Sequence, residues 1–402
     1  MKIRSITLFA DVPLPITAAV LAPWGDFVTR AQRAFIDAGF EVQTTRLATD
    51  LFPRLSALAG PGAWLDIAVT LEAPAREHGF EYVSLGPANL RLLPAVPELL
   101  AATRATFVTA RLLDPATGGI DGDAVRACAR VIQQAAHIEK GFGNLRFAAL
   151  AHVPPGVPFF PAAYHAGGPP TFALAMQAAD LAVLASSAPD AESARLRLVD
   201  YLEAEAARLL PVAECLAHDH GIPFTGIDFS LAPFPSMEYS IGAALEMLTG
   251  QPLGASGTLA AAATLASALD QARFPHAGFC GLMLPVLEDP VLAARAAEGR
   301  LSVGELLQWS AVCGTGLDTV PLPGDADKST LARLLFDVAA LSARARKPLT
   351  ARLMPLPGKV AGDPVHFDFA YFADGGVLAL PGTAAPGRLT ATSRLHLAPR
   401  AA

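Results

Sequence analysis

Three loops of this sequence carry side chains that could do acid–base or metal chemistry, and the first is residues 152–165, HVPPGVPFFPAAYH. Because proline fixes φ, this loop is expected to be stiff and to hold Tyr164 and His165 in place. Histidine is the usual acid, base or metal ligand near neutral pH, so His165 is a candidate catalytic residue. The alternative is a proline-stiffened crossing in which Phe159 and Phe160 pack inward.

The second loop, residues 226–238, contains Asp228 within an otherwise apolar strand. An unpaired carboxylate would be costly to bury there, so Asp228 needs a basic side chain, a set of backbone amides or a cation as its partner. This makes Asp228 a candidate catalytic and metal-binding residue. Glu238 begins the following helix, where the helix dipole favours a carboxylate, so capping explains it more simply.

The third loop, CGTGLDTVPLPGD, starts at Cys313. Gly314 and Gly316 would let backbone amides approach a ligand closely, which makes them candidate cofactor-binding residues. Cys313 could be a nucleophile if a base lies nearby, although a single cysteine can equally be a small buried hydrophobic residue. Asp318 and Asp325 are candidates for electrostatic or cation-binding roles.

A divalent cation is the cofactor that these side chains favour. Carboxylates from Asp228, Asp318 and Asp325 would suit Mg²⁺ or Ca²⁺, and a histidine partner would also admit Zn²⁺ or Mn²⁺. No nucleotide cofactor is expected. The phosphate-loop-like segment at 324–330 has Asp327 where a glycine should precede the lysine, and GFGNLR at 141–146 lacks the third glycine of a dinucleotide fingerprint.

Composition narrows the class of protein. Of 402 residues, 52% are hydrophobic and 17% are charged, with a net charge of −7, which argues against disorder and against a nucleic-acid partner. Four widely spaced cysteines favour reduced thiols and a cytoplasmic location, and the N-terminus resembles a first strand and not a signal peptide. The uncharged stretch 147–179 contains six prolines, so no membrane span is expected.

Strand and helix patterns alternate along the chain and must position these loops. Strands are expected at 3–10, 41–47, 145–152, 222–231, 279–286, 317–322 and 349–354, with helices between them, including 26–38, 123–140 and 171–185. This predicts one α/β domain over residues 1–380, followed by an Ala/Pro/Gly/Thr-rich extension at 381–402 that frays. In such folds functional groups gather beyond the carboxyl ends of the strands.

Five separated segments resemble one protein family. They are IRSIT, PPGVPFFPAAYH, GIDFSLAPFPS, GFCGLMLPVLED and AVCGTGLDTVPLPGD, spread from residue 3 to about 325, and RLMPLPGK at 352–359 continues them. The chain is identified by them as a member of the domain of unknown function 711 family, often named "PFL family" because its fold is similar to that of pyruvate formate-lyase. The resemblance implies a ten-stranded β/α barrel of the glycyl-radical-enzyme type, with a loop through its middle.

The resemblance does not imply radical chemistry. Pyruvate formate-lyase uses two adjacent cysteines and a glycine in a C-terminal R-V-x-G-[FWY] signature, and this chain has neither. We therefore expect a non-radical barrel enzyme of the lyase or isomerase type that acts on a small polar metabolite by acid–base or metal-assisted chemistry. His165, Asp228 and Asp318 would transfer protons or hold the cation, and Cys313 would line the pocket.

Two alternatives remain open. The chain could be a non-catalytic metabolite-sensing or partner-binding protein on the same barrel, or the charged residues could only tie loops to the barrel. A small-molecule ligand is the expected partner. A homodimer is also expected, because it is the commonest closed assembly.

Overall fold

Nine strands form one sheet in the computed structural model, which describes residues 1–55, 57, 61–382 and 387–399. Their order across the sheet is β8-β7-β1-β2-β3-β4-β6-β10-β9. The strands are β1 (Lys2–Phe9), β2 (Thr45–Ala48), β3 (Tyr82–Ala88), β4 (Thr106–Arg111), β6 (Phe147–Ala151), β7 (Thr171–Gln177), β8 (Phe224–Asp228), β9 (Gly316–Pro323) and β10 (Leu349–Leu356). The expected α/β class is confirmed.

The strands run in two directions. β1, β2, β3, β4 and β6 are mutually parallel neighbours. β7 joins β1 antiparallel and β10 joins β6 antiparallel, and each continues outward as a parallel pair, β7 with β8 and β10 with β9. At both ends of the strands, the carboxyl ends of some strands therefore lie beside the amino ends of others.

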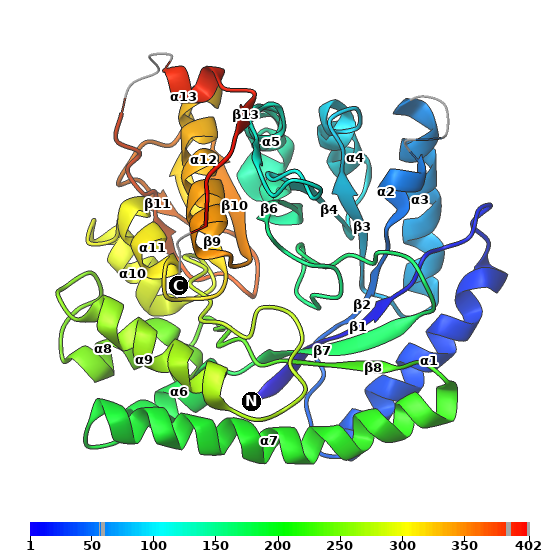
Figure 1. Ribbon diagram of the computed structural model, residues 1–402, viewed down its shortest axis with the longest axis horizontal. Helices are drawn as coiled ribbons and strands as arrows, with labels where there is room; N and C mark the ends of the chain where they lie inside the picture. The colour runs from blue at the N-terminus through cyan, green and yellow to red at the C-terminus, as the bar shows by residue number, and fades with distance from the viewer. Residues whose placement is uncertain (56, 58–60, 383–386, 400–402) are drawn as a thin grey trace.

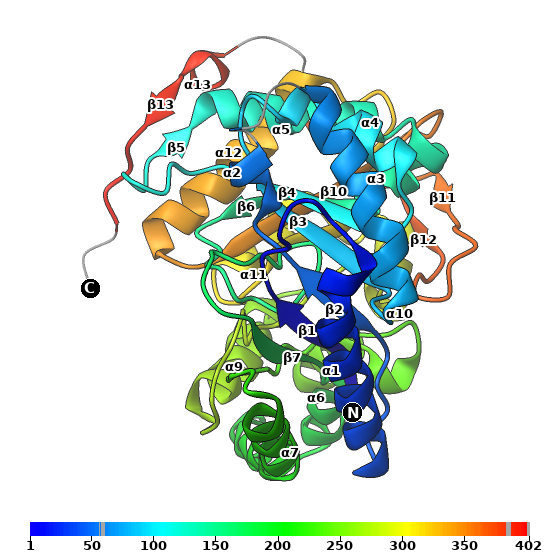
Figure 2. The ribbon, with the colours of Figure 1, turned by 90° about the vertical axis from the view of Figure 1, so that its right-hand side faces the viewer.

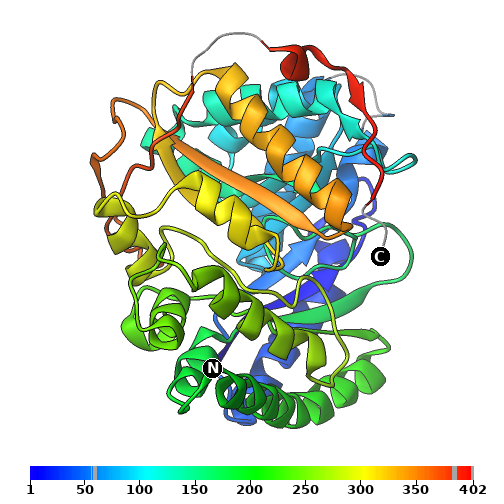
Figure 3. The ribbon, with the colours of Figure 1, turned by 60° about the vertical axis from the view of Figure 1, so that its left-hand side comes forward.

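Helices cover the outer face of the sheet and bury the main core against it (Figure 1). The long helix α7 runs along the bottom of that view, and α5 and α12 lie at the top. Figure 3 shows α12 lying alongside β10. The helices are α1 (Ala18–Asp37), α2 (Leu51–Leu55), α3 (Pro61–Glu77), α4 (Val96–Ala102), α5 (Gly122–Ala135), α6 (Ala179–Ser186), α7 (Ala191–His220), α8 (Ile241–Thr249), α9 (Thr258–Gln271), α10 (Pro290–Ala297), α11 (Val303–Ser310), α12 (Lys328–Ala345) and α13 (Arg388–Ala391), with 3-10 turns η1 (Leu93–Ala95), η2 (Ile138–Arg146) and η3 (Met237–Tyr239).

The proline-rich loop between β6 and β7 lies against the other, inner face of the sheet. Thr7 of β1 donates its hydroxyl to the Pro158 carbonyl at 2.9 Å, and Ser84 of β3 donates to the Ala163 carbonyl at 2.6 Å. Phe160 packs edge-to-face on Phe107 of β4, with the ring centroids 5.3 Å apart. The loop thus covers the inner face of the sheet. Its carbonyl groups accept hydrogen bonds from the hydroxyl groups of Thr7 and Ser84, which would otherwise be buried without partners.

A ten-stranded barrel is not confirmed. The segment 276–285, which includes most of the predicted strand 279–286, makes only isolated parallel bridges, Ile227 with His276, Leu231 with Leu282 and Pro285 with Asp318. The surrounding segment, PHAGFCGLMLP, begins and ends with proline, which cannot donate to a ladder, and Cys280 within it has φ of +41°. These features interrupt continuous pairing, although the bridges connect the segment to both edges of the nine-stranded sheet.

The helix predicted over 171–185 is wrong in its first half. Residues Thr171–Gln177 form strand β7, and α6 begins only at Ala179. β7 is buried almost throughout, so its sequence TFALAMQ shows neither a two-residue nor a 3.6-residue alternation, and its alanines suggested a helix.

The C-terminal extension contains short elements of its own. β13 (Arg394–Leu395) pairs antiparallel with β5 (Ile120–Asp121), as Figure 2 shows. Arg126 donates to the carbonyls of Thr390 and Thr392. β11 (Pro364–Val365) and β12 (Gly375–Gly376) form a second two-stranded pair. The predicted fraying falls partly on residues 383–386 and 400–402, which lie outside the described residues. No helix in the described part of the chain is both long and apolar enough to cross a membrane.

Candidate functional site

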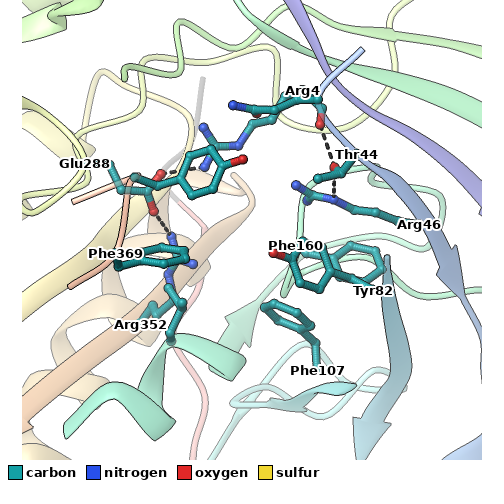
Figure 4. Close-up of a pocket in the computed structure, with 12 residues that line it drawn as sticks. Arg4, Thr44, Arg46, Tyr82, Phe107, Phe160, Glu288, Arg352 and Phe369 are labelled. Atoms are coloured by element: carbon teal, nitrogen blue, oxygen red, sulfur yellow. Dashed lines mark hydrogen bonds and ion pairs between the residues drawn. The ribbon is translucent and has the colours of Figure 1, made fainter. Parts of the chain in front are cut away.

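A cavity of about 60 Å³ lies on the inner side of the sheet and is lined by charged and aromatic side chains (Figure 4). It receives residues from the strands β1, β2, β3, β4 and β10 and from segments near 288 and 370. Its lining residues are Arg4, Gln43, Thr44, Arg46, Tyr82, Phe107, Leu145, Phe160, Glu288, Arg352, Phe369 and Tyr371. A neighbouring cavity of about 30 Å³ shares Arg4, Phe160, Glu288 and Arg352 with it and adds Asp318.

Four of these side chains form a continuous chain of ion pairs. Glu288 accepts from Arg4 Nη2 at 2.5 Å through Oε2 and from Arg352 Nη2 at 2.7 Å through Oε1. Arg352 also donates its Nε to Asp318 Oδ1 at 2.5 Å. Glu288 thus holds two guanidinium groups, whereas Asp318 shares one of them.

The pKa values of Glu288 and Asp318 are shifted in opposite directions. Burial opposes ionisation of Glu288, but Arg4 and Arg352 outweigh it and lower the pKa of Glu288 below its usual value. Burial raises the pKa of Asp318, Arg352 offsets this only in part, and the nearby charge of Glu288 adds to the rise. The Asp318 side chain is 16% exposed and lines the smaller cavity, so a ligand there can reach it. Such separation of two carboxyl groups is typical of sites that assign one of them to proton transfer.

Irregularities in the sheet place Arg4 and Asp318. The register of β1 on β7 shifts between Ile3 and Ser5, so Arg4 is an extra residue. In β9, Asp318 and Thr319 lie opposite the single residue Arg352 of β10, which makes a β-bulge. Thr319 has φ of +41°, a left-handed conformation that is strained for a β-branched residue. Bulges and strain of this kind are frequent beside functional sites, where they redirect a side chain.

Arg46 is the third arginine of the cavity and has different partners. Its Nε donates to Thr44 Oγ1 at 2.9 Å, and Thr44 in turn donates to the Arg4 carbonyl at 2.7 Å. Its guanidinium carbon lies 5.6 Å from the ring centre of Tyr82 and 5.1 Å from that of Phe160. Within the described residues, no carboxylate lies within 4 Å of this guanidinium, and neither Nη atom has a hydrogen-bond partner.

Burial makes the positive charge of Arg46 costly. Arg46 is only 6% exposed, and burial, together with the nearby charge of Arg4, lowers its pKa to about 10. A pKa of about 10 is lower than is usual for arginine but still well above neutral pH, so Arg46 is a cation at neutral pH. The cavity therefore contains a buried positive charge with no directly paired carboxylate among the described residues; the charges of Glu81 and Glu288 favour it only from beyond 4 Å.

The predicted residues His165 and Asp228 lie outside these two cavities. His165 is buried, and its Nδ1 lies 3.4 Å from Asp11 Oδ1. Asp228 accepts four hydrogen bonds, from the backbone amide and hydroxyl of Ser230 and from the amides of Phe279 and Cys280, at 2.6–3.0 Å. Burial raises the pKa of Asp228 to about 6. The sequence left open whether Asp228 is paired with a basic side chain, with backbone amides or with a cation. In the structure, backbone amides take this role.

The loop that begins at Cys313 mostly packs against the protein. Cys313 is buried, and its carbonyl accepts a hydrogen bond from Lys347 Nζ. A Cβ on Gly314 would lie 2.8 Å from Gly281 Cα, and one on Gly316, which has φ of +91°, would lie 2.3 Å from the Thr350 carbonyl oxygen. These two glycines thus permit close backbone packing.

The predicted metal ligands are not brought together. Asp325 is exposed after β9, Asp228 is enclosed by its amides, and Asp318 is paired with Arg352. Within the described residues, no three or more His, Cys, Asp or Glu side chains are grouped in a way that could hold a metal ion. The divalent cation and its ligands stay a prediction. Among the predicted site residues, Asp318 is the one that lines either cavity.

Four residues of the cavity were not predicted from the sequence: Arg4, Arg46, Glu288 and Arg352. Each arginine lies within a short strand whose other residues are mostly apolar or β-branched, in IRSIT, TRLA and LTARLMPL. A charged residue within a buried strand was the signal that selected Asp228, and the same signal applied to arginine would have found all three.

The fold and the cavity define a class: an α/β protein whose sheet carries a loop and a buried cluster of arginines and carboxylates on its inner face. The chain belongs to the DUF711 family, because the family model described as "Uncharacterised ACR (DUF711)" matches residues 1–369.

Curated relatives carry the name "UPF0210 protein". That of Pyrobaculum islandicum is 33% identical over 345 residues, covering 81% of this chain and 76% of the relative. Those of Pyrobaculum arsenaticum and Syntrophobacter fumaroxidans are 30% and 28% identical, covering 89% and 85% of this chain and 85% and 80% of the relatives. The family prediction is confirmed. The likeness to pyruvate formate-lyase is not.

Proposed function

We propose that this chain is a non-radical enzyme that acts on a small polar metabolite by acid–base chemistry in the cavity beside Arg352. One observation carries the proposal: Glu288 and Asp318 share Arg352, yet the pKa of Glu288 is lowered and that of Asp318 is raised. A proton-transfer group works best when its pKa lies near the working pH, and enzymes commonly raise a carboxyl pKa by burial to achieve this.

The roles follow from the contacts. Glu288 stays ionised and holds Arg4 and Arg352 in place. Asp318 takes a proton from the substrate and returns it, and its contact with Arg352 Nε fixes the orientation of its carboxyl group. Arg352 then stabilises negative charge that develops on the substrate as the proton leaves. Lyases and isomerases need this pair of functions, which supports the reaction type.

The segment 276–285 supports the enclosed form of the site. Its bridges reach Ile227 of β8 on one side and Asp318 of β9 on the other. We propose that it acts as a tenth, irregular strand and closes the sheet into a barrel around the 152–165 loop. A closed wall would keep water from the cavity and strengthen its electrostatic interactions.

Deuterium exchange tests the proposed proton transfer directly, whatever the overall reaction is. The protein would be incubated in D₂O with a panel of small polar metabolites, with and without carboxyl groups, and followed by proton NMR. We expect at least one compound to lose a carbon-bound proton signal or to be converted, and Asp318→Asn to slow this by about 100-fold or more.

The control is Asp325→Asn, which removes an exposed carboxylate from the same stretch of chain. It should react like the wild type. If a compound binds but is returned without exchange by the wild type, the sensor alternative replaces the enzyme. The predicted homodimer and cytoplasmic location remain predictions.

A further inference from the structure

Arg46 differs from the other arginines of the cavity, because it has no carboxylate partner among the described residues. We propose that the cavity binds one small monocarboxylate, whose two oxygens accept hydrogen bonds from the Nη atoms of Arg46. This inference relies on the proposed function only for the location of the substrate, and it names the substrate class. Guanidinium groups pair with carboxylates through two parallel hydrogen bonds, which gives both affinity and orientation.

The charges of the cavity favour a single negative charge on the ligand. The described side chains that line the two cavities include three guanidinium groups, of Arg4, Arg46 and Arg352, and two carboxylates, of Glu288 and Asp318, which leaves one positive charge. Glu81, whose charge also acts on Arg46, lies outside both linings. One carboxylate would neutralise it. A dianion would leave a surplus negative charge in a buried site, where uncompensated charge is costly.

The size and walls of the cavity limit the rest of the ligand. A volume of about 60 Å³ corresponds to about four to six water molecules, because one water needs about 10–15 Å³ by this measure. This suits a carboxylic acid with a short chain. The rings of Tyr82, Phe107 and Phe160 form a connected aromatic wall beside Arg46, with centroid distances of 5.3 Å between successive rings. An apolar end of the ligand would contact this wall.

A buried arginine with a purely structural role looks different in this protein. Arg146 is also buried, and it donates to the carbonyls of Leu100 and Thr106 and to the hydroxyl of Thr103. Its donors are used to cap the end of α4. The Nη donors of Arg46 face a cavity instead, as Figure 4 shows for its position among Tyr82, Phe160 and Thr44.

Calorimetric titration with propionate tests the inference, in a buffer without carboxylate or phosphate at low salt. We expect propionate to bind the wild type and propionamide, its neutral counterpart, to bind at least about 100-fold more weakly. Succinate and phosphate should also bind more weakly than propionate. Binding of propionamide at the affinity of propionate, or tighter binding of succinate or phosphate, would overturn the monocarboxylate class.

Two variants locate the binding. Arg46→Met should weaken propionate binding by about 100-fold, and Arg46→Lys, which keeps the charge but loses the paired donors, by about 10-fold. The control is Arg111→Met, since Arg111 also lies over a ring, that of Tyr164 at 5.0 Å, but outside both cavities. It should bind propionate as the wild type does. Wild-type affinity in a folded Arg46→Met variant would refute the assignment.

The inference and the proposed function fail in different ways. Propionate binding that depends on Arg46, without deuterium exchange in any metabolite, would leave the inference standing and remove the acid–base proposal. Exchange that depends on Asp318, with no effect of Arg46→Met on propionate binding, would do the reverse.

Discussion

Replacing Arg46 by methionine should change the free energy of unfolding by no more than about 1 kcal/mol, which is unusual for a buried, hydrogen-bonded residue. The fall in the pKa of Arg46 from 12.5 to about 10 corresponds to about 3 kcal/mol of unfavourable free energy for the charged form in the folded protein. Methionine removes this cost and fills a similar volume between the two aromatic rings.

The losses are similar in size to this gain. The hydrogen bond from the charged Arg46 to Thr44 contributes about 1.5 kcal/mol. The contacts with Tyr82 and Phe160 are desolvated and contribute about 2 kcal/mol each, of which the sulfur–aromatic contacts of methionine restore about 1 kcal/mol each. The net change in the free energy of unfolding is therefore close to zero, within about 1 kcal/mol. A buried charge whose removal costs the fold so little points to a role in function, as expected for a ligand-binding charge.

Urea denaturation of the ligand-free protein, followed by circular dichroism, measures this change. Arg146→Met serves as the matched control, because it removes the hydrogen bonds that Arg146 donates to Leu100, Thr103 and Thr106 and should cost about 3 kcal/mol. A loss of about 2 kcal/mol or more in Arg46→Met, similar to that of the control, would mean that Arg46 is a structural residue.

Three further predictions concern the elements that hold the site. Thr319→Gly should relieve the left-handed strain at φ of +41° and stabilise the fold by about 1 kcal/mol, while slowing any exchange that depends on Asp318; unchanged exchange would separate the bulge from the chemistry. Asp289→Ala should cost about 3 kcal/mol in urea denaturation, because Asp289 accepts from Ser240 and from the amides that begin α8 and α10; a change below about 1 kcal/mol would contradict this. Folding raises the pKa of Asp228 from 3.8 to about 6, so protonation of Asp228 should stabilise the protein increasingly as pH falls from about 6 to 4. This contribution should be absent when the free energy of unfolding of Asp228→Asn is measured over the same pH range.

The sequence allowed the fold class to be predicted because most strands are short apolar runs bounded by turn residues. β1, β6 and β10 are of this kind. β3 and β4 were missed: YVSLGPA contains a Gly-Pro pair that is typical of a turn, and TFVTAR is half polar. The register of β3 on β4 shifts between Ser84 and Pro87, so the irregularity is real but remains within the sheet.

Among the candidate site residues that the sequence suggested, only Asp318 lines one of the two cavities. Asp228 was correctly expected to need partners, but only the fold could show that those partners are the amides at 279 and 280, which are 51 and 52 residues away in sequence. The pairing of Glu288 with Arg4 and Arg352 joins residues 284 and 64 positions apart, and no local pattern encodes such contacts. The loop at 152–165 places Phe160 in the lining of the cavity, in agreement with the alternative that Phe159 and Phe160 pack inward. The same loop places His165 beside Asp11, outside both cavities.

The protonation state of Asp318 is the most direct test of the account. Carbon-13 NMR of carboxyl-labelled protein, titrated from about pH 3 to 8 and assigned by the signal missing in Asp318→Asn, would give its pKa. We expect a pKa above the ordinary value of 3.8, because burial and the charge of Glu288 outweigh the attraction of Arg352. A pKa below 3.8 would mean that Asp318 is a fixed counterion of Arg352 and would contradict its role in proton transfer.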